Sequence, residues 1–139
     1  MIGPFVADAS VAVAWIHPAQ ATEATRGMLQ SIREGAVVHV PALWPLEIAN
    51  VLLVLTRRGK LLDRDRRAAL GWIQRLPVEV DHEMASMAYG RLSDLACEYT
   101  LSVYDATYLE LAQRLNLPLG CKDGALRVAA QACGVSAWQ

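Results

Sequence analysis

The chain has 139 residues, 54% of them hydrophobic, and a formal net charge of -1, which fits one globular domain with a single core. No run of about 18 uncharged apolar residues occurs, so we expect no membrane span. The three cysteines form no C-x-x-C pair and the N-terminal residues are not basic, so we expect reduced thiols, no secretory signal and a cytoplasmic location.

The apolar pattern predicts strands that alternate with helices. In chain order, we expect a strand at residues 4–7, helices at 10–16 and 22–34, a strand at 36–40, helices at 43–58 and 63–76, a strand at 77–80, helices at 83–96 and 103–115, a strand at 117–120, a helix at 123–132 and a strand at 134–137. Ser10 and Ser102 are the expected N-caps of their helices, and Asn116 is an expected helix end. This alternation predicts an α/β fold in which a parallel sheet is covered on both faces, with residues 1–139 as one domain.

Four acidic residues interrupt or end hydrophobic runs: Asp8, Glu47, Asp105 and Asp123. Their positions draw the carboxylates toward the interior or into a cleft. Two like charges about 4 Å apart repel by about 4 kcal/mol at a surface-like dielectric, so a cluster of them needs a cation. A hard divalent metal that prefers oxygen ligands is the simplest candidate. Ligands collect at the carboxyl ends of parallel strands, and we therefore expect the four acids to meet at one edge of the sheet.

Each acid also has a purely structural interpretation. Asp8 and Asp123 follow strands, where an aspartate often caps the next helix. Asp105 lies in the first turn of a helix, where a negative charge is favourable by about 0.3–1 kcal/mol. Glu47 shares one helix face with Asn50, and that face could be exposed or paired with an arginine.

One basic cluster stands out in the middle of the chain. It consists of Arg57, Arg58, Lys60, Arg64, Arg66 and Arg67. The cluster is either a solvated helical surface or a contact for phosphates or an acidic partner. A net charge of -1 argues mildly against a nucleic-acid binder, but metal ions bound to four acids would leave a basic remainder. Lys122 lies in an open turn between glycines and is a candidate contact for a substrate phosphate.

Four segments of this chain, taken in order, are similar to a known family. They are Asp-Ala-Ser-Val at residues 8–11, Pro-Ala-Leu-Trp-Pro-Leu-Glu-Ile-Ala-Asn-Val-Leu at 41–52, Leu-Ser-Val-Tyr-Asp-Ala-Thr-Tyr-Leu-Glu-Leu-Ala at 101–112 and Asp-Gly-Ala-Leu at 123–126. These segments resemble the PIN-domain ribonucleases, and the closest match is the VapC toxin group of bacterial toxin–antitoxin pairs. The resemblance implies a three-layer α/β/α sandwich with a short, mostly parallel sheet. It also implies an acidic pocket for Mg²⁺ or Mn²⁺ and hydrolysis of RNA phosphodiesters by metal-activated water.

The resemblance assigns roles to particular residues. Asp8, Glu47, Asp105 and Asp123 correspond to the catalytic, metal-binding acids, and Ser10 and Asn50 correspond to residues that hold carboxylates or metal-bound water. It further implies a homodimer and a small VapB-type antitoxin that inserts into the active-site groove. One supporting position departs from the family, because Cys121 stands where a threonine or serine is usual and a thiol is a weaker hydrogen-bond donor.

Three other interpretations remain open at this point. Cys121 leaves room for a catalytically impaired PIN-fold protein that binds an antitoxin or RNA without cutting. A nuclease acting on DNA is another, because metal-assisted hydrolysis does not itself need a 2′-hydroxyl. A receiver-like phosphoacceptor domain would need paired acids after the first strand and a central aspartate. Asp8 stands alone, and only Asp81 ends a mid-chain strand.

Overall fold

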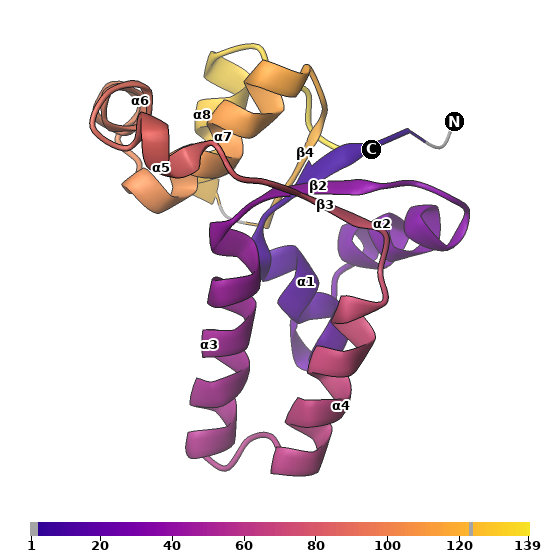
Figure 1. Ribbon diagram of the computed structural model, residues 1–139. Helices are drawn as coiled ribbons and strands as arrows, with labels where there is room; N and C mark the ends of the chain where they lie inside the picture. The colour runs from indigo at the N-terminus through magenta and orange to yellow at the C-terminus, as the bar shows by residue number, and fades with distance from the viewer. Residues whose placement is uncertain (1–2, 123) are drawn as a thin grey trace.

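A four-stranded, all-parallel sheet with helices on both faces forms the centre of the computed structural model, which describes residues 3–122 and 124–139 (Figure 1). The strands are β1 (Phe5–Ala7), β2 (Val38–Pro41), β3 (Val78–Asp81) and β4 (Leu119–Gly120). They are short, and their order across the sheet is β3-β2-β1-β4. The α/β/α sandwich with a short parallel sheet is thereby confirmed.

The sheet has a reversal of strand order beside β1. The chain runs outward from β1 to β2 and β3 and then returns to the other side of β1 for β4. Val6 is therefore paired with His39 on one side and with Leu119 on the other. In open parallel sheets, ligands bind outside the carboxyl ends of the strands at such a reversal. Asp8 directly follows β1 at this point.

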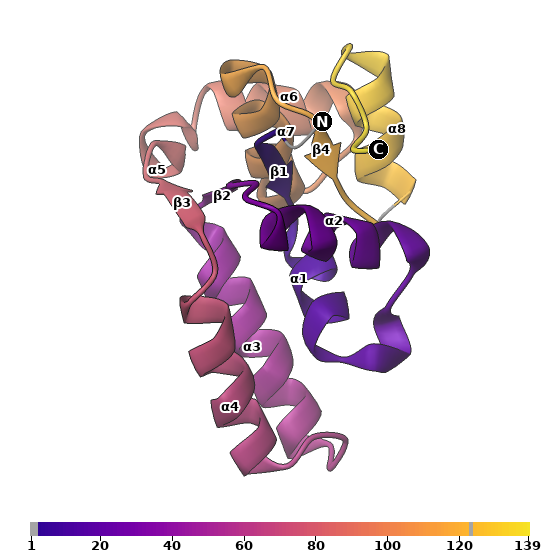
Figure 2. The same ribbon diagram turned by 90° about the vertical axis from the view of Figure 1, so that its right-hand side faces the viewer.

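The helices form a layer on each side of the sheet (Figures 1 and 2). One side holds α1 (Ala9–Ile16), η1 (Pro18–Gln20), α2 (Glu23–Arg33), α3 (Leu43–Arg57) and α4 (Asp63–Gln74). The other side holds α5 (Met84–Met87), α6 (Arg91–Tyr99), α7 (Val103–Leu115) and α8 (Gly124–Ala132). No helix in the described ranges has the length and apolar character needed to cross a membrane.

Helix α7 is the most deeply buried helix on its side and has the predicted bounds. It begins after Ser102, whose hydroxyl oxygen accepts a hydrogen bond from the Asp105 backbone N–H at 3.0 Å. It ends at Asn116, whose φ of 54° lies in the left-handed region that asparagine tolerates. Asp105 and Tyr108 lie on one face of this helix, because residues three apart are neighbours. The helix thus holds the candidate site residue Asp105 on a rigid element.

Helices α3 and α4 form an antiparallel hairpin that projects away from the sheet (Figure 2). We call this hairpin the α3–α4 arm, and we call residues 57–67 its tip. Gly59, with a φ of 72°, provides the left-handed backbone at the turn, as its position after the predicted helix indicated. Ile48 and Leu52 of α3 are fully buried at the base of the arm.

Three local predictions were wrong. The N-cap of α1 is Asp8, whose carboxylate accepts the capping hydrogen bond, and Ser10 lies one residue inside the helix. The helix predicted at residues 83–96 is two helices, because the backbone at Gly90 is non-helical (φ -117°, ψ -99°). Of the fifth strand predicted at residues 134–137, only a single bridge between Leu119 and Ala137 is formed.

Candidate active site

Asp8 lies at the junction of β1 and α1, at the carboxyl edge of the sheet. Its Oδ1 accepts hydrogen bonds from the Ser10 hydroxyl at 2.7 Å and from the Val11 backbone N–H at 3.2 Å. The residue is only 6% exposed. Asp8 therefore caps α1 and, at the same time, presents a carboxylate at the edge where ligands of parallel sheets bind. The two interpretations of Asp8 do not exclude each other.

Glu47 reaches the same region from α3. Its Oε1 accepts a hydrogen bond from the hydroxyl of Tyr108 on α7, a residue that is 1% exposed. This contact joins two helices that lie on opposite sides of the sheet. Among the side chains of residues 3–122 and 124–139, no lysine or arginine forms an ion pair with Glu47, so the expected alternative of a salt bridge to an arginine is not found.

The carboxylates of Asp8, Glu47 and Asp105 influence one another electrostatically. Burial raises the pKa of Asp8 to about 6; the hydrogen bonds from Ser10 and Val11 oppose this shift, and the charges of Asp105 and Glu47 add to it. Burial also raises the pKa of Glu47, against the hydrogen bond from Tyr108 and with a contribution from Asp105. Burial and the bond to Glu47 raise the pKa of Tyr108, so its hydroxyl stays protonated and remains a donor. Three of the four predicted acids are thus brought together.

The donor chemistry of this cluster suits a hard divalent cation. Its atoms are carboxylate oxygens whose mutual repulsion a cation would relieve, and these are the ligands that Mg²⁺ and Mn²⁺ prefer. Within the described residues, however, no three His, Cys, Asp or Glu side chains are close enough to hold an ion by themselves. Asp123, the fourth predicted acid, lies outside the described residues. The three described acids therefore fit a metal by chemistry and charge and do not form a closed cage.

A cleft of about 360 Å³ opens beside Glu47. Val51 and Leu55 of α3 contribute apolar wall, and the polar lining comes from Ser10, His17, Gln20, Glu47 and Lys122. The Lys122 ammonium donates to the backbone oxygen of Gln20 at 2.6 Å and to its side-chain oxygen at 3.3 Å. Lys122 is thereby held at the rim of the cleft.

The other two predicted supporting residues are Asn50 and Cys121. Asn50 is exposed and borders a small hollow together with Glu47 and Tyr104. Cys121 is half-buried and packs against the hydrophobic core.

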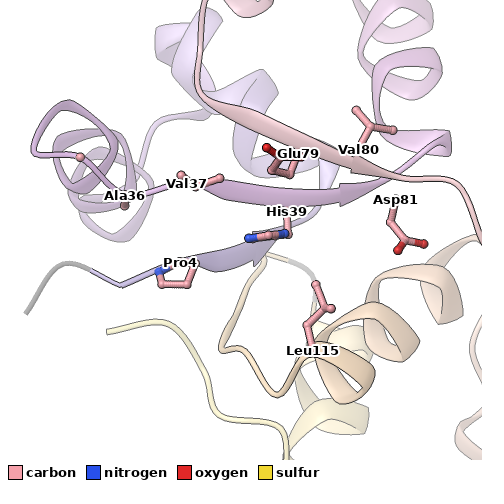
Figure 3. Close-up of a pocket in the computed structure, with 9 residues that line it drawn as sticks. Pro4, Ala36, Val37, His39, Glu79, Val80, Asp81 and Leu115 are labelled. Atoms are coloured by element: carbon pink, nitrogen blue, oxygen red, sulfur yellow. The ribbon is translucent and has the colours of Figure 1, made fainter.

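A larger hollow of about 580 Å³ lies elsewhere, between the β2–β3 side of the sheet and the end of α7 (Figure 3). His39 of β2 and Leu115 of α7 line it, and Asp8, Glu47 and Asp105 do not. Asp81, at the carboxyl end of β3, borders this hollow, but both of its oxygens accept hydrogen bonds from Arg114 at 2.8 Å. Asp81 is therefore tied to α7 by an arginine and lies apart from the acidic cluster.

Tyr108 is the site residue that the sequence did not single out. The sequence feature that could have indicated Tyr108 is its spacing of three residues from Asp105, which places the tyrosine hydroxyl on the same face of the helix as that acid. A single hydroxyl in an apolar helix is more often a packing residue, so the spacing alone did not reveal the contact with Glu47. Only the packing of α7 near α3 does so.

We expect Tyr108→Phe to weaken metal binding without disrupting the fold. The ring still fills its buried position, while Glu47 loses its donor and its orientation. Loss of a hydrogen bond that orients a metal ligand typically costs about 10- to 100-fold in metal affinity or activity. Mn²⁺ titration followed by electron paramagnetic resonance would measure this, with Tyr104→Phe as the control on the same helix. An unchanged Mn²⁺ affinity would contradict the role of Tyr108.

The molecule is an α/β/α sandwich with a parallel sheet, and an acidic side chain follows the strand at which the strand order reverses. It therefore belongs to the class of α/β proteins with a polar site at the carboxyl edge of the sheet. The sequence matches the PIN domain over residues 5–130, which is most of the chain. The chain belongs to the PIN domain family. No curated protein matches it.

Solved structures show the same fold at low sequence identity. The structure of VapBC2 from Rickettsia felis bound to a DNA fragment from their promoter is 10% identical, with a TM-score of 0.66 and coverage of 97% of both chains. FitAcB from Neisseria gonorrhoeae is 17% identical, with a TM-score of 0.65 and coverage of 97% of this chain and 96% of that one. A toxin–antitoxin complex from Klebsiella pneumoniae is 16% identical, with a TM-score of 0.54 and coverage of 86% of both.

Proposed function

We propose that this protein is a Mg²⁺- or Mn²⁺-dependent endoribonuclease of the VapC toxin type. The observation that carries the proposal is that the carboxylates of Asp8, Glu47 and Asp105, from three separate elements, interact electrostatically with one another, and that Asp8 directly follows β1. Membership of the PIN family supports it, because PIN domains are generally nucleases. The likeness to a protein solved in a toxin–antitoxin complex supports the toxin assignment.

Asp8, Glu47 and Asp105, with Asp123, would hold the metal. When bound, a divalent cation would activate a water molecule and neutralise charge on the attacked phosphate. The protein's own residues prepare the site. Ser10 orients Asp8 through its hydroxyl, and Tyr108 does the same for Glu47. Asn50 and Cys121 are proposed as further supporting residues.

Lys122 is proposed to contact a phosphate of the RNA. It is already positioned at the rim of the cleft by Gln20, so an incoming phosphate would exchange with this contact. The attraction between an ammonium and a phosphate would place the RNA backbone beside Glu47, which lines the same cleft. In this role Lys122 binds substrate and takes no part in bond breaking.

The test of this function is digestion of a mixed RNA pool by the purified protein, free of antitoxin, with Mg²⁺ or Mn²⁺. We expect discrete cuts with 3′-hydroxyl and 5′-phosphate ends that disappear in EDTA. A matched DNA pool separates the ribonuclease from a DNA nuclease. Absence of cutting, in a folded protein that still binds Mn²⁺, would instead favour the impaired PIN-fold protein. Cys121→Thr would then be the first variant to test for recovery of RNA cleavage.

We further propose a homodimer and a VapB-type antitoxin as partners. Exposed apolar side chains gather where α3 and α7 begin: Leu46 is 67% exposed, Tyr104 is 64% exposed and Val103 is 40% exposed. Leu43 and Tyr104 also line an apolar hollow of about 160 Å³ next to these side chains. Contiguous exposed apolar surface of this kind marks a protein interface. The dimer would bury it, and the antitoxin would occupy the cleft beside Glu47.

Replacing Leu46 and Tyr104 together by serine should convert the dimer to a monomer. The change removes two large apolar anchors from the surface and leaves the core untouched. Sedimentation-velocity centrifugation would measure the mass in solution. Val128→Ser is the matched control, because Val128 of α8 is 64% exposed and lies outside this surface. Dimerisation that survives the double substitution, or that is lost in the control, would place the interface elsewhere.

A further inference from the structure

Charge is strongly segregated between the tip of the α3–α4 arm and the rest of the molecule. The tip, residues 57–67, contains six basic and two acidic side chains. The remainder of the chain contains seven basic and twelve acidic ones. An overall charge of -1 therefore conceals a positive tip, of net charge +4, on an acidic body. Segregation of this size creates a local potential that attracts polyanions.

Four of the six cations at the tip are available to a ligand. Arg57, Arg58, Lys60 and Arg64 are exposed, and none of them takes part in the ion pairs or side-chain hydrogen bonds formed among the described residues. The other two are held internally. Arg66 and Arg67 both donate to the carboxylate of Asp63, at 2.7 and 2.8 Å. Two of the six cations of the tip are thus paired within the tip, and the other four form no ion pair among the described residues.

A single face of α3 connects this end to the acidic cluster. Glu47, Val51 and Leu55 follow one another at intervals of four residues and all line the cleft. Arg58 comes three residues later and continues the same stripe. At 1.5 Å per residue, Arg58 lies about 16 Å along the helix axis from Glu47. Figure 2 shows α3 running from the sheet to the turn at the tip of the arm. A chain that lay in the cleft and extended along α3 would therefore reach the basic tip.

The chemistry of the tip favours RNA over an acidic protein as its occupant. Protein interfaces are anchored by buried aromatic and large apolar side chains. On the tip, the one large apolar side chain that is well exposed within the described part of the chain is Leu62, at 57%. Guanidinium groups, in contrast, match phosphate oxygens in a bidentate way. Outside the tip the chain has a net charge of -5, from seven basic and twelve acidic residues, which disfavours RNA binding there, so a separate cationic contact would add affinity.

We propose that Arg57, Arg58, Lys60 and Arg64 form a backbone-binding site for RNA, several nucleotides away from the scissile phosphate. This proposal rests on the proposed function, because it takes RNA as the substrate. The site reads phosphates and not bases, so it adds affinity for any single-stranded RNA long enough to span from the cleft to the tip.

The test compares two quadruple variants of equal charge change. The first replaces Arg57, Arg58, Lys60 and Arg64 by glutamine. The second, the matched control, replaces four exposed arginines outside the tip by glutamine: Arg26, Arg33, Arg75 and Arg127. Both are made in an Asp8→Asn background so that RNA is not cut during the measurement. Fluorescence anisotropy with labelled poly(U) and with a short oligouridylate, at several salt concentrations, reports the affinity, and circular dichroism checks that each variant is folded.

The tip variant should bind poly(U) at least about tenfold more weakly at low salt. The slope of log K against log[salt] should fall by about 0.7 for each phosphate that the tip no longer neutralises. Binding of the short oligouridylate should not change, and the control should retain the affinity and slope of the parent. Equal losses in both variants, or poly(U) binding unchanged in the tip variant, would overturn the proposal. Loss of binding to poly-L-glutamate with unchanged poly(U) binding would also overturn it and would identify a protein-docking tip.

The same proteins with Asp8 intact separate failure of this proposal from failure of the proposed function. If the parent neither cuts nor binds RNA, the proposed function fails and the proposal falls with it. If the parent cuts RNA and the tip variant cuts long RNA with an unchanged KM, the function stands and the tip proposal alone is wrong. A raised KM for long RNA with an unchanged kcat supports both.

Discussion

Asp8→Asn is expected to abolish metal-dependent RNA cleavage and, at the same time, to make the metal-free protein more stable near neutral pH. Asparagine is as good an N-cap as aspartate and can still accept hydrogen bonds from Ser10 and Val11, so α1 keeps its start. The feature that disappears is the negative charge. The metal needs that charge, whereas the metal-free fold is destabilised by it.

The pH dependence of stability follows from the raised pKa of Asp8. Its pKa in the folded protein is about 6, above the ordinary value of 3.8, so the folded state holds the proton more tightly than the unfolded state. The contribution of Asp8 to stability is then greatest below its ordinary pKa, declines as pH rises through this interval and levels off above it. Each pKa unit corresponds to about 1.4 kcal/mol, so the loss is about 3 kcal/mol.

Urea unfolding of the metal-free protein between pH 4 and pH 8 would measure this effect. Asp8→Asn should remove the part of that decline that Asp8 causes, while Glu47, whose pKa is also raised, keeps its own part. The variant should be more stable than the parent at neutral pH by up to about 3 kcal/mol. Added Mg²⁺ or Mn²⁺ should stabilise the parent and have little effect on the variant. Asp94→Asn is the control, because Asp94 is an exposed acid of α6. Full RNA cleavage by Asp8→Asn, or a parent whose stability increases over this pH range, would refute the assignment.

Arg114→Met is expected to destabilise the fold strongly, although Arg114 lies outside the acidic cluster. Arg114 of α7 donates to Glu110 on its own helix, at 2.9 Å, and to both oxygens of Asp81 at the end of β3. Glu110 is 5% exposed. Removing the arginine leaves a buried carboxylate without its partner, which costs about 3–5 kcal/mol, and the partial exposure of Arg114 favours the lower end.

The lost stability should be recovered when the carboxylate of Glu110 is removed as well. Arg114→Met combined with Glu110→Leu leaves no buried carboxylate at this position of α7, so most of the lost free energy of unfolding should return. Urea unfolding at pH 7 would measure both variants. Arg91→Met serves as the control, because Arg91 is exposed and donates to Gln113 at 2.7 Å without a carboxylate partner among the described ion pairs. A double variant as unstable as the single one would show that Arg114 acts through packing.

Features of this fold that depend on local chemistry could be predicted from the sequence. The start of α7 follows from a serine whose side chain caps the free N–H groups, and its end follows from an asparagine that tolerates the left-handed conformation. The parallel sheet follows from the alternation of apolar strands and helices. The same topology is the reason for expecting Asp8, Glu47, Asp105 and Asp123 at one edge, and the electrostatic interaction among the first three agrees with it.

Where two local signals competed, the sequence was ambiguous. Asp8 and Ser10 are both good N-caps. Because β1 ends at Ala7 and α1 begins at Ala9, the residue between them, Asp8, is the N-cap. The helical pattern of residues 83–96 continued across Gly90, but the chain changes direction there. Apolar residues near the C-terminus favoured a strand, yet only Ala137 meets the sheet edge in β geometry.

Tertiary structure alone decided which side chains meet across elements. Two of these contacts join residues that are distant in sequence: Tyr108 donates a hydrogen bond to Glu47, and Arg114 donates to Asp81. The position of the basic tip relative to the acids likewise depends on how α3 packs. Capping and periodicity act over about one helical turn, so they determine where elements begin and which face is apolar. The rotation and distance of one helix relative to another depend on the whole core, and these set the partners of each acid.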